Sequence, residues 1–119
     1  MTPSSHNRWG QLAENIRFET RAFIRGDYCQ ATSKNVFQTK NPATRTELAV
    51  FPDSDADTID RAVAAARDAF QQWRHLAPEQ RKSLLLTVAN QIETERETLA
   101  LLDCLEMGMP ISMALEQVE

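Results

Sequence analysis

The sequence predicts an α+β chain in which two small β-hairpins are followed by about three helices. Two patterns lead to this prediction: short β-type runs separated by turn residues occupy positions 22–52, and apolar residues at helical spacing occupy positions 53–119. The composition agrees, because 42% hydrophobic and 25% charged residues in a chain of 119 are typical of a folded globular protein. We therefore expect a single domain over 1–119, with an N-terminal arm over 1–21.

Charge is divided unevenly along the chain. Residues 1–52 carry seven Lys or Arg against four Asp or Glu, and residues 53–119 carry six against thirteen, so the halves have charges of +3 and −7 and the chain −4. An acidic helical half would repel a phosphate backbone, so we expect no nucleic-acid partner. Nothing approaches the run of about 18 apolar residues that spans a membrane, and positions 1–21 lack the apolar core of a signal peptide. We therefore expect no membrane partner and a cytoplasmic location.

The arm contains a short predicted helix. Leu12 and Ile16 are spaced as on one face of a helix, and Trp9 and Phe18 flank them. This pattern places the helix within residues 9–19.

Turn residues define the two hairpins. The first is predicted from strands at 22–24 and 28–30, because Gly26 between them supplies the positive φ of a tight turn. The second is predicted from strands at 36–39 and 47–51, joined through Asn41-Pro42-Ala43-Thr44. There Pro42 fixes φ for a turn, and the side chain of Asn41 can bond its own backbone two residues on.

The helical half begins at Asp55, a favourable N-cap residue. An apolar stripe then follows at spacings of three and four residues. Its members are Ile59, Val63, Ala66, Phe70 and Trp73. Asp57 and Arg61 form an i,i+4 ion pair on the other side of this helix.

A second helix is predicted to start at Pro78 and to bend in the charged segment 94–98. Gly108 fits its C-terminal cap, Pro110 prevents its continuation, and a new helix starts near Ser112. Apolar residues at 84–86 cover most of one helical turn. A helix with so wide an apolar surface requires cover on more than one side.

Few residues are candidates for catalysis. Glycine occurs only at positions 10, 26 and 108, which excludes glycine-rich dinucleotide and phosphate loops. Cys29 and Cys104 are interpreted as small apolar residues of a strand and a helix, and His75 as a residue at a helix end. The acidic cluster at 53–60 is explained by helix initiation. We find no set of nucleophile, base and oxyanion donors, so we assign no catalytic and no cofactor-binding residue.

One ordered series of motifs is more specific than its parts. It comprises Ala22-Phe23-Ile24-x-Gly26, Asn41-Pro42-Ala43-Thr44, the pattern D-R-A-V-x-A-A-x-x-A-F-x-x-W at 60–73, Arg81-x-x-Leu84, Leu99-Ala100 and Gly108-x-Pro110. At these separations the series resembles the N-terminal part of the aldehyde dehydrogenase superfamily. The arm that precedes it resembles that of bacterial members acting on γ-glutamyl- or amino-aldehydes.

This resemblance implies a partial domain, the N-terminal part of an α/β enzyme that oxidises an aldehyde to a carboxylic acid with NAD or NADP. In the family a cysteine thiolate attacks the aldehyde and a glutamate activates water, and both groups lie beyond the part matched here. We therefore expect this chain alone to be inactive and to bind no cofactor. Its partners would be the rest of the enzyme or further copies in a homo-oligomer, and the aldehyde would bind only a full-length enzyme. The alternative is a stand-alone, non-catalytic binding or interaction module that dimerises to cover its apolar stripes.

The resemblance also implies a monovalent-cation site. Some relatives bind such an ion through backbone oxygens near the Asn-Pro turn and an acidic side chain before Gly-x-Pro. By position these residues are Thr39, Lys40 and Glu106. The sequence departs from the family at two positions nearby. Arg45 replaces the usual Gly, so that its turn must change type or bear left-handed strain, and Met109 replaces the usual Lys.

Overall fold

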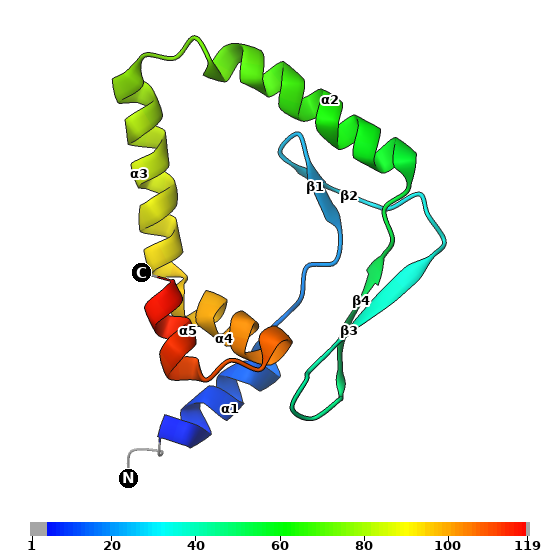
Figure 1. The fold of residues 1–119 in the computed structure, drawn as a ribbon, viewed down its shortest axis with the longest axis vertical. Coiled ribbons are helices and arrows are strands. Elements are labelled where there is room, and N and C mark those ends of the chain that lie inside the picture. Colours follow the sequence, from blue (N-terminus) through cyan, green and yellow to red (C-terminus); the bar gives the residue numbers. More distant parts are fainter. Residues whose placement is uncertain (1–4, 119) are drawn as a thin grey trace. The chain divides into compact units, whose positions relative to one another are not determined.

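The fold was obtained as a computed structural model that describes residues 5–118 (Figure 1). Two separate two-stranded sheets, β1–β2 and β3–β4, lie between an N-terminal helix and four further helices along the sequence, so the predicted order of hairpins followed by helices is confirmed. The bounds are α1 Ser5–Asn15, β1 Ala22–Ile24, β2 Asp27–Cys29, β3 Val36–Lys40, β4 Glu47–Pro52, α2 Ala56–Trp73, α3 Pro78–Thr94, α4 Arg96–Met107 and α5 Ile111–Gln117.

The chain divides into two compact units that are not contiguous in sequence. One unit comprises Met1–Glu19, Thr39–Leu48 and Asn90–Glu119, and the other comprises Thr20–Gln38 and Ala49–Ala89. The first unit therefore contains α1, the turn between β3 and β4, and the helices α4 and α5. The second contains the first hairpin, α2 and most of α3.

Helix α1 spans Ser5–Asn15 and not the predicted 9–19. The side-chain amide of Asn15 donates to the carbonyl oxygen of Gln11 at 2.8 Å, within the last turn of the helix. The Ile16 N–H bonds the Ala13 carbonyl at 3.4 Å, a contact three residues back that tightens the helix end. The apolar spacing identified the helix but not its end, because Phe18 belongs to the irregular segment that follows.

The first hairpin is antiparallel, with Ala22 opposite Cys29 and Phe23 opposite Tyr28. Both turn residues have positive φ, 58° at Arg25 and 91° at Gly26. This is the requirement of a type I′ turn, whose twist matches that of paired strands. The sequence indicated Gly26 alone. The strand was predicted to start at residue 28 but starts at Asp27, because the turn holds only two residues.

The second hairpin confirms the predicted role of the Asn-Pro turn. The Asn41 side-chain oxygen accepts the Ala43 N–H at 2.9 Å, and the Asn41 N–H donates to the Thr46 carbonyl at 2.9 Å. Arg45 has φ 62° and donates its N–H to the Asn41 carbonyl at 2.7 Å. The left-handed strain expected where the family usually has Gly is therefore present.

Local signals start and stop the helices as predicted, with one difference. Asp55 caps α2 by accepting the Thr58 N–H at 2.9 Å, α3 begins at Pro78, and Gly108 ends α4 with φ 71°. The charged segment 94–98 was predicted to bend one helix, but it contains a break between two helices. Glu95, with φ −95° and ψ 11°, separates α3 from α4, so the second predicted helix is two helices.

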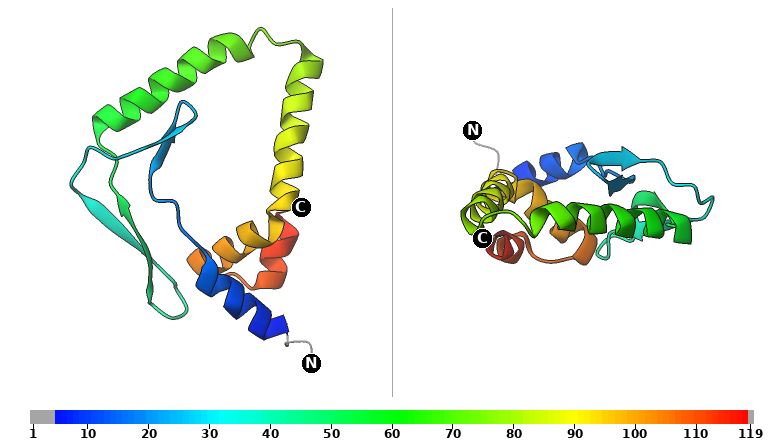
Figure 2. Two further views of the ribbon diagram at one scale, coloured as in Figure 1. Left: turned by 180° about the vertical axis from the view of Figure 1, so that it is seen from behind. Right: turned by 90° about the horizontal axis from the view of Figure 1, so that it is seen from above.

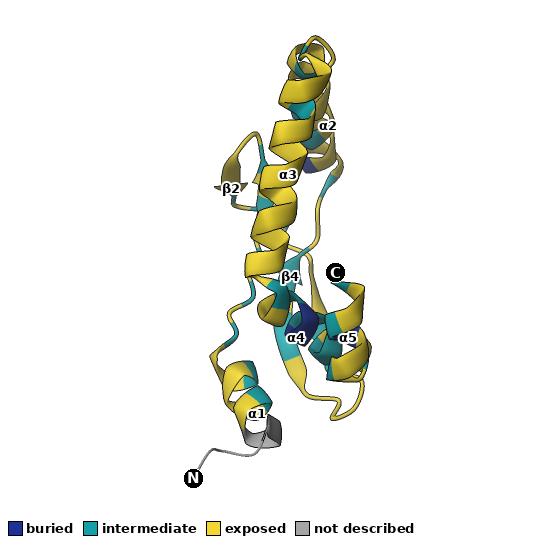
Figure 3. Ribbon diagram, turned by 90° about the vertical axis from the view of Figure 1, so that its left-hand side faces the viewer, coloured by how far each residue is buried: buried dark blue, intermediate teal, exposed yellow. Residues whose placement is uncertain are grey.

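The most buried apolar side chains lie between α4 and α5, which pack side by side (Figure 2). Among the residues whose burial the structure describes, Ala100, Leu101 and Ala114 are the buried apolar ones. The Arg96 guanidinium donates to the Leu115 carbonyl at 2.7 and 3.1 Å, which ties the start of α4 to the end of α5. Along α3, by contrast, no residue is buried (Figure 3). Within residues 5–118, no helix has the length and apolar character needed to cross a membrane.

Candidate functional site

The segments that carry the expected cation ligands meet at the end of α4. Thr39 and Lys40 end β3 and precede the Asn41-Pro42 turn, and Glu106 lies in the last turn of α4, two residues before Gly108. A Cβ added to Gly108 would lie 2.9 Å from Cγ of Pro42, so the turn and the helix end are in close contact. Thr39 is half-buried, whereas the side chains of Lys40 and Glu106 are exposed.

The chemistry of these donors matches a monovalent cation better than a transition metal. Backbone carbonyls and one carboxylate are hard oxygen ligands, whereas zinc and its neighbours prefer imidazole and thiolate. Within residues 5–118, no group of three or more His, Cys, Asp or Glu side chains is placed to hold a metal ion.

Cys29, Cys104 and His75 lie on different parts of the fold, in β2, in α4 and just after α2. Both cysteines are free and half-buried, and the Cys29 thiol contacts the Asp27 carbonyl at 3.6 Å. His75 is exposed and follows the C-cap residue of α2, as expected for a residue at a helix end. These positions agree with their interpretation as structural residues.

Asp55 has the one clearly shifted pKa among the described residues. The Thr32 hydroxyl donates to one carboxylate oxygen at 2.6 Å, and the Thr58 N–H donates to the other at 2.9 Å. These hydrogen bonds, that of Thr32 first, stabilise the charged form and lower the pKa of Asp55 from 3.8 to about 2. The carboxylate therefore ties the loop before β3 to the start of α2. Its role is structural, since all of its partners are hydrogen-bond donors of the fold.

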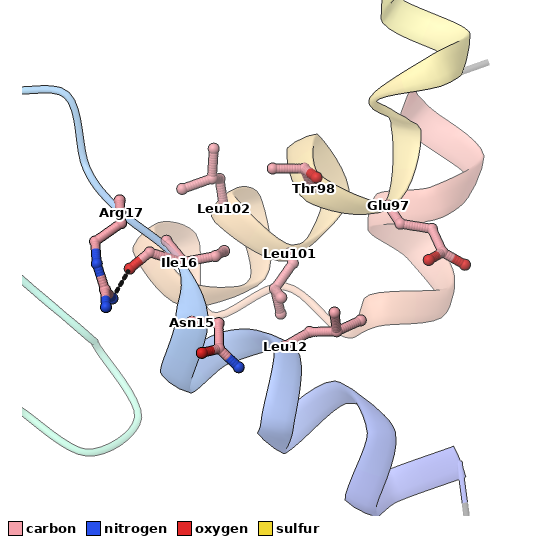
Figure 4. A pocket seen from close by; sticks show the side chains of 8 residues that line it. All are labelled: Leu12, Asn15, Ile16, Arg17, Glu97, Thr98, Leu101 and Leu102. Carbon is pink, nitrogen blue, oxygen red and sulfur yellow. Dashed lines mark hydrogen bonds between the residues drawn. The ribbon is translucent and has the colours of Figure 1, made fainter.

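A cavity of about 310 Å³ lies between α1 and α4 (Figure 4). Its apolar lining comes from Leu12 and Ile16 on one side and from Leu101 and Leu102 on the other. An ion pair between Arg8 and Glu97 joins the same two helices. No pattern in the sequence indicates this pair, because the two residues are 89 positions apart and the glutamates at 93–97 resemble a solvent-exposed corner.

The apolar stripes that were predicted to require cover are largely exposed in this chain. On α2, Ile59 is 51% and Phe70 55% exposed, and a shallow hollow along the helix is lined by Phe70, Trp73 and Leu76 among others. On α3, Leu84, Leu85, Leu86, Val88 and Ile92 are all exposed. Monomers rarely leave apolar side chains so concentrated in water. Exposed apolar faces of this size are typical of surfaces that contact another protein or segment.

Known proteins share both the sequence and the fold. The sequence profile described as the aldehyde dehydrogenase family matches residues 28–119. The NADP/NAD-dependent aldehyde dehydrogenase PuuC of Escherichia coli K12 is 37% identical over 109 residues, which cover 90% of this chain and 22% of that protein. Aminoacetaldehyde dehydrogenase of Pseudomonas aeruginosa is 36% identical over 109 residues, again with 90% of this chain and 22% of the relative covered.

The same relationship holds in three dimensions. A mutant of the P. syringae indole-3-acetaldehyde dehydrogenase AldA, solved in complex with NAD⁺ and IAA, matches with a TM-score of 0.88 and 40% identity over 95% of this chain and 23% of that one. The chain thus spans about a fifth of the length of the relatives that it matches. Since the family profile covers well over half of the sequence, the chain belongs to the aldehyde dehydrogenase family.

Proposed function

We propose that this chain forms the N-terminal scaffold of an oxidoreductase that oxidises an aldehyde to a carboxylic acid with NAD⁺ or NADP⁺. The observation that supports this most is the exposure of the α2 and α3 apolar faces in a chain whose fold matches about a fifth of such enzymes. The remaining part of the enzyme would cover these faces. We propose that both compact units belong to one partial domain, and that the assembled protein is a cytoplasmic homo-oligomer.

The name of the aminoacetaldehyde dehydrogenase relative supports an amino-aldehyde as the substrate class, as the resemblance of the arm also suggests. The chain itself contributes no reacting group in this proposal. In the assembled enzyme NAD(P)⁺ would accept the hydride. The three glycines of this chain lie in α1, at the turn of the first hairpin and at the end of α4, and none of them forms a phosphate-binding loop. The residues present therefore do not form a dinucleotide-binding site, and we assign them no role in hydride transfer. The isolated chain should be inactive and bind neither cofactor.

We further propose that the Thr39 and Lys40 backbone carbonyls and the Glu106 carboxylate hold a structural monovalent cation such as Na⁺ or K⁺. The contact between Pro42 and Gly108 supports this, because it brings the two segments that carry these groups to the same place. One carboxylate against a singly charged ion leaves the site neutral. Such an ion would fix the end of α4 against the Asn-Pro turn and take no part in the reaction.

Complementation tests the scaffold proposal. The 119-residue chain is mixed with a form of the PuuC relative that lacks its matching segment, and NAD(P)H formation is followed with an aldehyde that intact PuuC oxidises. We expect turnover only when both pieces are present, because the second piece covers the α2 and α3 faces. Each piece alone should be inactive.

A matched pair of α3 variants shows whether the face is responsible. Leu85→Asp adds a charge to the exposed apolar face, whereas Asn90→Asp adds the same charge on the polar side of the same helix. Leu85→Asp should abolish complementation and Asn90→Asp should preserve it. Turnover by the chain alone would overturn the proposal. The stand-alone module would be favoured if the wild-type chain and Asn90→Asp both form a soluble dimer and neither complements the truncated relative.

A further inference from the structure

Gly108 differs from the other two glycines in what surrounds its α-carbon. A Cβ built on Gly10 or Gly26 meets no heavy atom within 4 Å. A Cβ on Gly108 would lie 2.9 Å from Cγ and 3.8 Å from Cβ of Pro42, where ordinary van der Waals contact begins at 3.4 Å. Gly108 also has φ 71°, a conformation that L side chains rarely adopt. The backbone here thus favours glycine, and the neighbouring Pro42 leaves no room for a Cβ.

Neither side of this contact can easily yield. Pro42 is a rigid ring in a turn closed by hydrogen bonds of Asn41 to Thr46 and to Ala43. On the helix side, the Gly108 N–H bonds the Cys104 carbonyl at 3.1 Å. Just beyond it, the Pro110 carbonyl accepts two N–H groups of α5, among them that of buried Ala114. An added methyl group would therefore push two hydrogen-bonded segments apart and not a flexible side chain.

We propose that the close contact between the α-carbon of Gly108, which carries no side chain, and the Pro42 ring sets the spacing of the cation ligands. We call this contact the interlock. Lys40 precedes Pro42 by two residues and Glu106 precedes Gly108 by two, so the contact lies between the two ligand-bearing segments. Moving a Cβ from 2.9 to 3.4 Å requires a shift of 0.5 Å. Metal–ligand distances in well-formed sites agree with their ideal values to within about 0.2 Å, so a larger shift at the ligands would disturb the site. Gly108 is then a positioning residue, and this role rests on the proposed cation site.

The same observation explains the Gly of the Gly-x-Pro motif in this chain. Helix termination requires only that residue 108 tolerate a left-handed conformation, which Asn also does. The contact with Pro42 requires in addition that no Cβ be present. The two requirements can be separated by choosing the substitution.

The test measures cation affinity and thermal stability of the 119-residue chain and five variants. The variants are Gly108→Ala, Gly108→Asn, Pro42→Ala, the double variant Gly108→Ala/Pro42→Ala, and the control Gly10→Ala. Affinity for Na⁺ and for K⁺ is taken from the rise in unfolding temperature as each replaces tetramethylammonium at constant ionic strength. This readout does not depend on enzyme activity.

Gly108→Ala and Gly108→Asn should each weaken cation binding by about tenfold or more, because both add a Cβ and shift the ligands, and losing a group that orients metal ligands typically costs about 10–100-fold in affinity. Gly108→Asn relieves most of the backbone strain, so it keeps the test valid if Gly108→Ala does not fold. Pro42→Ala removes the Cγ that the new Cβ would meet. The double variant should therefore bind the ion more tightly than Gly108→Ala, and Gly10→Ala should bind like wild type.

The two ways to fail are distinguishable. If the wild-type chain is not stabilised by Na⁺ or K⁺, the cation site is wrong and the positioning role is wrong with it. If the wild type binds the ion but Gly108→Ala has the same effect whether residue 42 is Pro or Ala, the interlock is wrong and the cation site stands. Coupling between positions 42 and 108 in both cation affinity and unfolding temperature supports the proposal.

Discussion

Helices α3 and α4 are both regular, yet they differ in what their apolar side chains contact. α4 buries Ala100 and Leu101 and packs on α5, which buries Ala114. α3 is longer, with 17 residues, and buries none. Local sequence signals therefore suffice to start and stop a helix, whereas burial requires a partner that α3 does not have within the described residues.

This difference has an energetic consequence. A helix of about 15 residues is only marginally stable in water without packing, so α3 should depend on a partner more than α4 does. Burying a fully exposed Leu side chain contributes about 1.5–3 kcal/mol, and Leu84, Leu85 and Leu86 are 49–60% exposed, so covering each would contribute part of that amount. The five apolar residues of α3 thus represent stabilisation that is realised only on assembly.

The largest expected effect is a contrast between one buried and one exposed leucine. Leu101→Ala should destabilise the α4–α5 pair by about 2–4 kcal/mol, because a buried side chain (5% exposed) leaves a cavity. Leu85→Ala, at a position that is 60% exposed, should change stability by less than about 0.5 kcal/mol. Both stability changes are measured by urea unfolding, with hydrogen exchange of the α4 amides as the residue-level signal. Equal losses at the two positions would remove the distinction between the helices.

A smaller effect is expected at the turn that contacts the end of α4. Arg45→Gly removes left-handed backbone strain of about 1 kcal/mol. It also raises the entropy of the unfolded chain, which costs about 0.5 kcal/mol, so the folded chain should gain about 0.5 kcal/mol of stability. Arg25→Gly is the matched control with the same kind of φ. It also loses the exposed ion pair of Arg25 with Asp68 at 2.6 Å, so its gain should be smaller. Thermal unfolding compares them; a larger gain at Arg25 than at Arg45 would contradict the assignment of strain.

The smallest effect is a pH dependence confined to the start of α2. Asp55 has a lowered pKa in the folded chain, so its hydrogen bonds stabilise the chain fully above 3.8 and are lost as the pH falls from there through about 2. Asp55→Asn should abolish this part of the acid sensitivity because the amide does not titrate. Amide chemical shifts near Thr58 follow the titration, with those of α4 as the internal reference. A titration of the Thr58 signal near 3.8 would show that the pKa is not lowered.

Features that depend on neighbouring residues in the chain were predictable from the sequence. The Asn41 side-chain bond, the Asp55 cap, the start of α3 at Pro78 and the left-handed Gly108 each follow from a short motif. The strain at Arg45 was also predictable, because a residue with a side chain stands where the family usually has Gly. Strand and helix ends were predicted less accurately, because the two-residue turn and the C-terminal end of α1 depend on hydrogen bonds that no single residue type indicates.

Contacts between distant segments were not predictable from local patterns. Arg8 and Glu97 are 89 positions apart, and Arg25 and Asp68 are 43 apart, so neither pair has a local signature. The contact of Pro42 with Gly108 is of the same kind. The candidate cation residues came from resemblance to a family. What the structure adds is the contact that brings their two segments together.

Residue-resolved hydrogen exchange of the isolated chain tests the central claim most directly. Our account predicts that amides of α4 are protected by its packing on α5, and that amides of α3 exchange many times faster although the same helix is formed. Adding the truncated PuuC relative should slow exchange in α3 and leave α4 nearly unchanged. Equal, strong protection of both helices in the isolated chain would show that α3 needs no partner and would contradict the account.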